Sequence, residues 1–268
     1  MTDDLKVHIL ECGAMGTDIE QLLGSPKYRA SAHNHHRERV WTSCQLHAVL
    51  IEHPGGLILW DTASSRDWET EWEGTGLKDV IPYDQVTEEQ YLDSRLHQLG
   101  FELGDIDTVV LSHLHMDHAG NAKLFDNGST RFVVNQAELD GALAFDGFFQ
   151  GGHIKNDYQH LRFDTVSGDT ELIPGVELLE VPGHSFGQMA LKVDLPKDGT
   201  MIFTSDAVYL EETVEQRHWG SVVWDNRAWL ASLDKILKIR DDTDATLVFG
   251  HDSAQIAKLR TGVGNYYS

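Results

Sequence analysis

The sequence predicts an α+β fold in which β-sheets lie in layers beneath helices. Short runs rich in β-branched and aromatic residues recur along the 268 residues, and turn residues separate them. Segments with one apolar helical face lie between these runs. Strands and helices occur both before and after about residue 130. We therefore expect a single domain over residues 1–268, built of two similar halves that divide near residue 130 and pack sheet to sheet.

The predicted strands are short, and several of them end in polar residues. The second and third are joined by Pro54-Gly55, which predicts a hairpin. The runs cover residues 5–11, 46–53, 56–61, 106–112, 130–135, 176–182, 189–195, 200–206 and 245–250.

The predicted helices follow capping signals or an apolar stripe. Residues 87–99 begin with a Thr-x-x-Gln capping box and end at Gly100. Residues 135–145 begin with Asn-x-x-Glu, and residues 226–240 carry Trp229, Leu230, Leu233, Ile236 and Leu237 on one face, which indicates burial.

Two further segments, residues 13–45 and 62–86, look irregular. Long irregular segments in a compact domain are often binding loops. Residues 13–45 would either cover a pocket or form a contact in a homodimer, and the sequence does not distinguish these roles. Three histidines in this segment, His33, His35 and His36, lack a strand or helix frame, so we interpret them as part of a solvated loop.

The charge balance limits the partners of the protein. With 43 acidic and 21 basic side chains the net charge is −22, which disfavours nucleic acid and anionic membrane surfaces. The two cysteines, Cys12 and Cys44, are scattered, which is typical of a reducing compartment. The N-terminus has no signal-peptide pattern and no stretch is apolar enough to span a membrane, so we expect a cytoplasmic protein.

The segment SHLHMDHAG, residues 112–120, carries four metal-ligating side chains directly after an apolar strand: His113, His115, Asp117 and His118. As core residues they would leave donors and acceptors unpaired, and a solvated loop would not need the apolar strand that precedes them. Side chains alternate along an extended chain, so His113 and His115 point the same way and Asp117 and His118 point elsewhere. The spacing predicts two adjacent ion sites.

Two ions need more ligands than this segment supplies. His184, Asp206 and His251 each follow an apolar strand, where loops converge at one sheet edge. Nitrogen and oxygen ligands without thiolates suit Zn²⁺ best, with Fe, Mn or Co as alternatives. Three other histidines, His153, His160 and His218, lie in predicted loops without ligand partners, and we assign them no role.

These motifs resemble the metallo-β-lactamase superfamily. HLHMDH matches its HxHxDH signature, and GHS, SDA and GHD around His184, Asp206 and His251 follow in the right order. The resemblance extends from about residue 5 to about residue 267. It implies an αββα sandwich, with two mixed sheets packed face to face, helices outside, and a dinuclear metal site at one sheet edge.

The resemblance also implies a role for each motif residue. The first ion would be held by His113, His115 and His184, and the second by Asp117, His118 and His251, with Asp206 bridging them. Asp61, which ends a predicted strand, matches the buried aspartate that braces the histidine loop. The family usually has glycine where this chain has Ala63.

SDAVY, residues 205–209, narrows the resemblance to the N-acyl-homoserine lactonases, the quorum-quenching enzymes. In that group a tyrosine, here Tyr209, follows the bridging aspartate and faces the substrate carbonyl. The implied reaction opens the lactone ring by attack of a metal-bridging hydroxide, with Asp117 carrying a proton to the leaving oxygen. The product would be N-acyl-homoserine. The alternatives are a hydrolase of another small lactone, a glyoxalase II-like thioesterase, or a metal-binding module without activity.

Overall fold

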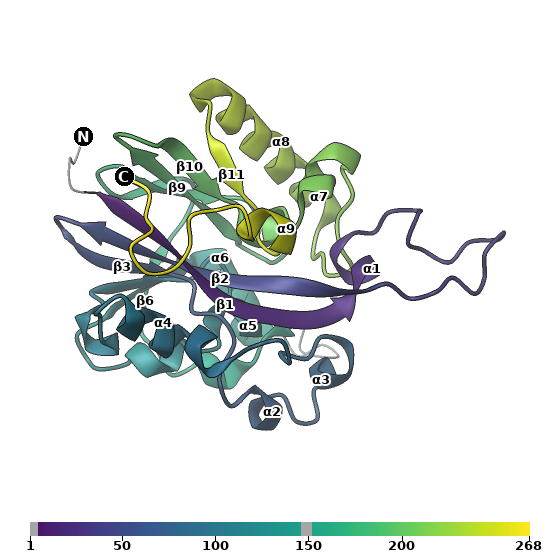
Figure 1. The fold of residues 1–268 in the computed structure, drawn as a ribbon, viewed down its shortest axis with the longest axis horizontal. Helices are drawn as coiled ribbons and strands as arrows, with labels where there is room; N and C mark the ends of the chain where they lie inside the picture. Colours follow the sequence, from purple (N-terminus) through teal and green to yellow (C-terminus); the bar gives the residue numbers. More distant parts are fainter. Residues whose placement is uncertain (1–4, 146–151) are drawn as a thin grey trace.

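The computed structural model describes residues 5–145 and 152–268, and its centre consists of two β-sheets that pack face to face (Figure 1). In the described residues the first sheet is mixed, because its first three strands pair antiparallel and its later neighbours pair parallel. Its strands, in spatial order, are β1 (Lys6–Asp18), β2 (Trp41–His53), β3 (Gly56–Trp60), β4 (Thr108–Val110), β5 (Arg131–Asn135) and β6 (Phe163–Val166).

The second sheet is also mixed. Among its described strands β10 and β11 pair parallel, and the other pairs are antiparallel. Its strands, in spatial order, are β11 (Thr246–Val248), β10 (Gly199–Phe203), β9 (Met189–Leu195), β8 (Val176–Glu180) and β7 (Thr170–Ile173).

Most helices are short, and α8 is the longest. The α-helices are α1 (Ile19–Leu22), α2 (Trp68–Glu71), α3 (Leu77–Val80), α4 (Leu92–Gln98), α5 (Met116–Ala119), α6 (Gln136–Ala144), α7 (Glu211–Gln216), α8 (Asn226–Thr243) and α9 (Ser253–Ile256). The 3₁₀ turns are η1 (Glu88–Gln90), η2 (Leu103–Asp105), η3 (Ala122–Phe125), η5 (Lys155–Asp157) and η6 (Ser205–Ala207).

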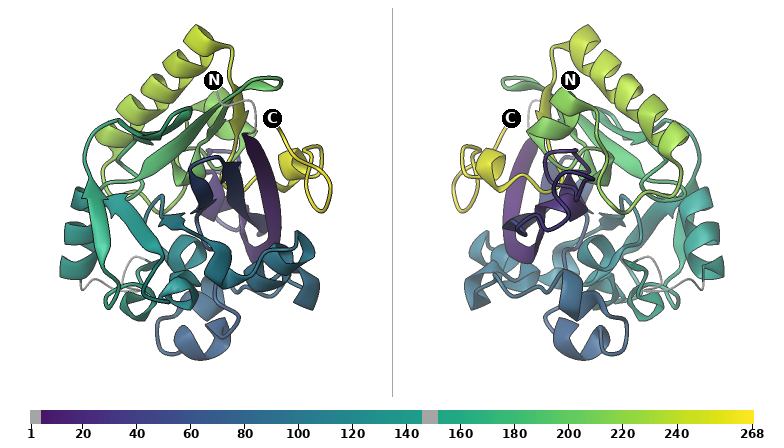
Figure 2. Two further views of the ribbon diagram at one scale, coloured as in Figure 1. Left: turned by 90° about the vertical axis from the view of Figure 1, so that its left-hand side faces the viewer. Right: turned by 90° about the vertical axis from the view of Figure 1, so that its right-hand side faces the viewer.

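Three apolar clusters hold four layers together. One lies between the sheets, where Val49 and Val110 of the first sheet meet Leu191 and Phe203 of the second. Another packs the outer face of the first sheet against α4 and its neighbouring segments. A third packs the apolar stripe of α8 on the outer face of the second sheet. Figure 2 shows the resulting order of helices, sheet, sheet and helices, which is the αββα sandwich that the resemblance implies.

The expected elements occur, and the structure differs from the prediction in several places, including the short helices α2 and α3 within residues 62–86. Residues 87–99 are not one helix but η1 followed by α4, because the capping box closes only a short turn before Tyr91 returns to an extended conformation. Strands β6 and β7 were not predicted. The segment 13–45 is less irregular than expected, because β1 and β2 pair as far as Asp18 and Trp41.

The chain passes from the first sheet to the second between Val166 and Thr170. Strands β5 and β6, which follow residue 130, still pair with the first sheet. The division into two similar halves near residue 130 stays a prediction.

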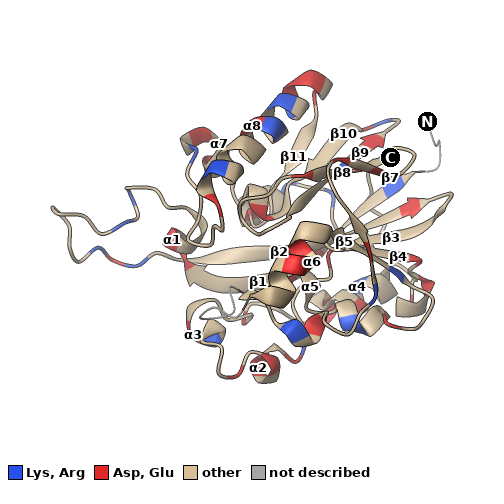
Figure 3. Ribbon diagram, turned by 180° about the vertical axis from the view of Figure 1, so that it is seen from behind, with Lys and Arg blue, Asp and Glu red and all other residues tan. Residues whose placement is uncertain are grey.

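Residues 24–40 form an arm that extends away from the layers (Figure 1). His33, His35 and His36 are exposed on it, as the interpretation of a solvated loop requires. Acidic residues occur on elements of both helical layers, including α2, α6 and α7 (Figure 3). Both cysteines are buried and free. Among the described helices, none has the length and apolar character that crossing a bilayer requires.

Candidate metal centre

The residues of the HLHMDH motif lie at the end of the first sheet. The chain leaves β4 at Val110, and His115 becomes the residue before α5, so Asp117 and His118 lie in the first turn of that helix. All four predicted ligands of this segment are at least 93% buried. The motif therefore bends from extended chain into helix, which gives its two pairs of ligands different directions, as the alternation of side chains predicts.

The remaining predicted ligands come from the second sheet. His184 lies in the loop between β8 and β9, Asp206 lies in η6 after β10, and His251 follows β11. All three are buried. The two sheets thus bring together residues that are up to 138 positions apart in the sequence, from His113 to His251.

The first group of ligand atoms is a triangle of three imidazole nitrogens. His113 Nε2 lies 3.0 Å from His115 Nδ1 and 3.2 Å from His184 Nε2, and His115 Nδ1 lies 2.9 Å from His184 Nε2. Asp206 Oδ2 lies 3.3 Å from His184 Nε2. We call this group site 1; its four ligand atoms lie close enough to share one ion.

The second group, site 2, contains Asp117, His118 and His251 and uses the other oxygen of Asp206. Asp206 Oδ1 lies 3.0 Å from both His118 Nε2 and His251 Nε2. Asp117 Oδ2 lies 3.5 Å and 3.6 Å from the same two nitrogens. Asp206 therefore belongs to both sites through different oxygens, which is the arrangement of a bridging carboxylate.

In two of the three site 1 histidines the second ring nitrogen contacts an uncharged group. His113 Nδ1 lies 3.0 Å from Ser112 Oγ, and His184 Nδ1 lies 3.0 Å from the carbonyl oxygen of Val222. Such contacts fix the ring orientation and the tautomer, and they leave the other nitrogen free to bind an ion.

In site 2 a buried carboxylate takes this role. Asp61 Oδ2 lies 2.8 Å from His118 Nδ1, and the backbone N–H and hydroxyl of Ser112 donate to the same carboxylate at 2.7 and 2.8 Å. His251 Nδ1 lies 2.9 Å from the carbonyl oxygen of Gln45. Asp61 thus lies where the resemblance puts the bracing aspartate.

The backbone around the centre is strained. Asp61, Ala63 and Ser205 have φ angles of 58°, 54° and 46°, which non-glycine residues rarely adopt. The left-handed conformation at Ala63 is a physical reason for the glycine that the family usually has there. Strained residues persist where the surrounding structure holds them, and they cluster at functional sites.

The two sites differ in electrostatics. In site 1, burial and neighbouring imidazoles hold the pKa values of His113 and His115 well below the usual range, and burial lowers the pKa of His184 to about 4. In site 2, burial also opposes the charged imidazole, but nearby acidic groups outweigh it, so the pKa values of His118 and His251 lie well above the usual range.

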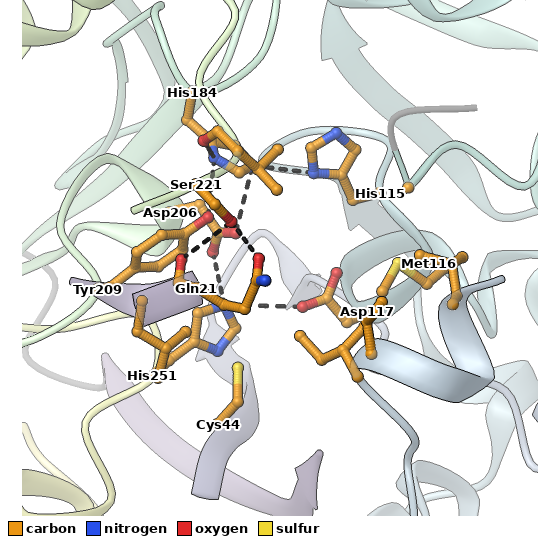
Figure 4. A pocket seen from close by; sticks show the side chains of 16 residues that line it. Gln21, Cys44, His115, Met116, Asp117, His184, Asp206, Tyr209, Ser221 and His251 are labelled. Carbon is orange, nitrogen blue, oxygen red and sulfur yellow. Dashed lines mark hydrogen bonds and ion pairs between the residues drawn. The ribbon is translucent and has the colours of Figure 1, made fainter. Parts of the chain in front are cut away.

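The centre lies in a pocket of about 310 Å³ (Figure 4). His115, His184, Asp117, Asp206 and His251 line it, and Tyr209 lies on its wall with its hydroxyl oxygen 3.0 Å from His184 Nδ1. Apolar side chains from α1, α3, α5 and the loop before α8 form another part of the wall; they are Leu22, Leu77, Val80, Ile81, Met116 and Val222.

Sequence reasoning missed three buried residues at the centre. Cys44 lies far from every motif in sequence, yet it lines the pocket next to His251. His153 is not an ordinary loop residue: its ring lies 4.5 Å from that of His115, and its Nδ1 lies 3.1 Å from the carbonyl oxygen of Leu114. Glu138 is fully buried against the histidine loops. No local sequence pattern marks Cys44 or His153. Glu138 is marked only as the last residue of the Asn-x-x-Glu helix start.

The donor atoms fit two divalent ions. His118 Nε2 and Asp206 Oδ1 are buried and have no hydrogen-bond partner although they lie 3.0 Å apart. Buried polar atoms are rarely left without a partner, and a cation between them would satisfy both. Imidazole and carboxylate ligands suit Zn²⁺ and related transition metals. The residues therefore indicate a dinuclear divalent metal site.

A four-layer αββα fold with a dinuclear His/Asp site at the sheet edge defines a class of metal-dependent proteins. The chain belongs to the metallo-beta-lactamase superfamily, whose family model matches residues 41–251.

Within that class, the chain is similar to proteins named N-acyl homoserine lactonase. It is 31% identical to one from Bacillus thuringiensis over 215 residues, which cover 79% of this chain and 82% of that protein. It is 29% identical to AttM of Rhizobium radiobacter over 213 residues, or 76% and 80% of the two chains. A solved N-acyl homoserine lactone hydrolase, with N-hexanoyl-L-homoserine at its catalytic metal centre, superposes with a TM-score of 0.83 at 27% identity, covering 97% and 98% of the chains.

Proposed function

We propose that this chain is a metal-dependent lactonase that opens the ring of N-acyl-homoserine lactones and so inactivates quorum-sensing signals. The observation that carries the proposal is the pair of ligand groups joined by Asp206 at the bottom of a pocket that also holds Tyr209. The similarity to named lactonases over most of the chain supports it. We further propose that both ions are Zn²⁺, held by the seven ligands described above.

Two ions bound there would supply a hydroxide near neutral pH and would polarise the lactone carbonyl. Tyr209 then has a defined task. Burial, Asp206 and Asp117 together hold the pKa of Tyr209 well above its usual value, so its hydroxyl stays protonated. It can donate a hydrogen bond to the carbonyl oxygen as negative charge develops there, which is where electrostatic stabilisation lowers the barrier most.

Asp117 would carry a proton to the leaving ring oxygen. When the bond between the carbonyl carbon and the ring oxygen breaks, that oxygen leaves as an alkoxide and must be protonated. Asp117 lines the pocket beside the ligands of both sites, which places its carboxylate within reach of that oxygen. The product is the ring-opened hydroxy acid.

The apolar and neutral residues of the pocket wall favour an acylated, uncharged substrate. Six of its described residues are apolar, and Gln21 and Ser221 offer neutral hydrogen-bonding groups beside them. Among the described residues that line the pocket there is no lysine or arginine, so the pocket offers no cation to the carboxylates of glutathione. This argues against the glyoxalase II-like alternative.

A substrate panel tests the proposal. Release of acid from N-hexanoyl-homoserine lactone, an aromatic fused lactone and a glutathione thioester should be measured on one sample, together with its metal content. We expect the acyl-homoserine lactone to give the highest kcat/KM and zinc to approach two ions per chain. Faster thioester cleavage would favour the thioesterase, and a folded, zinc-loaded protein that cleaves none of the three would favour a module without activity.

A further inference from the structure

Glu138 is a buried carboxylate that the proposed reaction does not use. It lies in the first turn of α6 and its residue is 0% exposed. Burying a carboxylate is costly unless hydrogen bonds compensate for the lost water. Glu138 Oε1 accepts from the backbone N–H of Leu114 at 3.0 Å, and Oε2 accepts from the backbone N–H of Gly187 at 2.9 Å.

The two donors belong to the two loops that build site 1. Leu114 lies between His113 and His115, and Gly187 lies three residues after His184. These loops come from different sheets, yet their imidazole nitrogens converge to within 3.2 Å. One carboxylate therefore ties together the backbones that carry all three histidines of site 1.

Helix α6 gives this carboxylate a fixed base. Asn135 caps the helix by accepting from the N–H of Ala137 at 2.8 Å. A Cβ atom on Gly187 would come within 2.4 Å of Asn135 Oδ1, and one on Gly141 within 2.2 Å of the Phe186 ring. The loop after His184 therefore packs directly on the backbone of α6.

Site 2 is held differently. His118 contacts Asp61 and His251 contacts the carbonyl oxygen of Gln45, and none of the contacts described for the site 2 ligands involves Glu138. Asp61 also accepts from the backbone N–H and the hydroxyl of Ser112, which precedes His113, but the ligand side chain that it contacts directly is His118 of site 2. Glu138 contacts the two loops of site 1 instead.

We propose that Glu138 is a positioning residue that sets the geometry of site 1 by joining its two histidine loops. The proposal rests on the dinuclear centre of the proposed function. Its consequence is selective: losing the Glu138 contacts weakens the ion at site 1 and leaves the ion at site 2 in place.

Glu138→Gln tests this, because glutamine keeps the shape but can accept only one of the two N–H groups through its oxygen. Metal-free protein is titrated with Zn²⁺ against a competing chelator, and zinc positions are located by anomalous diffraction of the loaded protein. We expect affinity for one of the two ions to fall about 10–100-fold, with reduced occupancy between His113, His115 and His184. Asp157→Asn is the matched control: Asp157 is a buried carboxylate paired with Lys123, and its loss should leave both affinities unchanged.

Unchanged affinity for both ions in Glu138→Gln, or equal weakening at both sites, would overturn the positioning role. If the variant does not fold, hydrogen exchange of the wild-type amides decides: Leu114 and Gly187 should be protected in the metal-free protein, and rapid exchange at either would overturn the proposal. A wild-type protein that binds no metal would instead refute the proposed function, so the two failures are distinguishable.

Discussion

Site 1 and site 2 share Asp206 but are built on opposite electrostatic principles. In site 1 three imidazoles form a triangle, and Asp206 is the one carboxylate among the ligand atoms described there. Site 2 places His118 and His251 among acidic groups. The same residue type is consequently held neutral in one half of the centre and favoured as a cation in the other half when no metal is present.

The difference between site 1 and site 2 shows that the identity of the ligands alone does not describe a metal site. A neutral imidazole is ready to donate its lone pair, whereas a protonated one must first release its proton. Burial and the neighbouring ionisable groups together decide which state each histidine adopts. Changes to single residues should therefore affect site 1 and site 2 differently.

Replacing the shared ligand should affect both sites at once. Asp206→Asn removes the bridging charge, so we expect fewer than two zinc ions per chain and a turnover of lactone lower by about 10³-fold or more. Elemental analysis and initial rates measure both effects. Asp194→Asn, an exposed aspartate of β9, is the control and should keep two ions. Full activity in Asp206→Asn would show that neither site depends on this residue.

Removing the hydroxyl of Tyr209 should lower kcat without changing the zinc content. Tyr209→Phe loses the proposed donor to the developing oxyanion, and kcat should fall by about 10²-fold. The zinc content should stay that of the wild type, because Tyr209 is not among the ligands of either group. Unchanged kcat would remove Tyr209 from the mechanism.

Replacing Asp61, which contacts His118, should weaken the ion at site 2, whereas Glu138→Gln weakens the ion at site 1. Asp61→Asn weakens the contact to His118 Nδ1, so we expect the ion at site 2 to bind about 10–100-fold more weakly. Competition with a chelator measures the two affinities. A larger loss at site 1 than at site 2 would contradict the assignment of Asp61.

The smallest expected effect is the dependence of metal affinity on pH. His118 and His251 have raised pKa values, so an ion entering site 2 must displace protons, and its affinity falls as the pH falls from 8 to 6. The histidines of site 1 have lowered pKa values, about 4 for His184, so they are already neutral and affinity there should barely change over this range. Calorimetry in buffers of different ionisation enthalpy would show proton release for one ion and not for the other; equal release would contradict the difference.

The sequence predicts which seven side chains come together in the two groups, because each follows an apolar strand and HLHMDH concentrates four of them in six residues. Residues that support the centre were harder to predict. Glu138, His153 and Cys44 act through contacts between elements far apart in the chain, and such contacts leave no periodic signal. The apolar pocket wall is similar, because it collects side chains from α1, α3 and the loop before α8.

The fold shows the same limit. The long apolar strands were predicted because alternation and β-branched residues mark them. Strands β6 and β7 have four residues each and several exposed positions, so their pairing partners define them more than their own composition does. The extension of β1 to Asp18 depends likewise on its pairing with Trp41 of β2.

The proposed lactone hydrolysis needs both sites filled. A stepwise Zn²⁺ titration of metal-free protein tests this directly, with the rate of N-hexanoyl-homoserine lactone opening recorded at each addition. We expect full activity to appear only as the second ion per chain binds. Full activity with one ion, or with none, would contradict it.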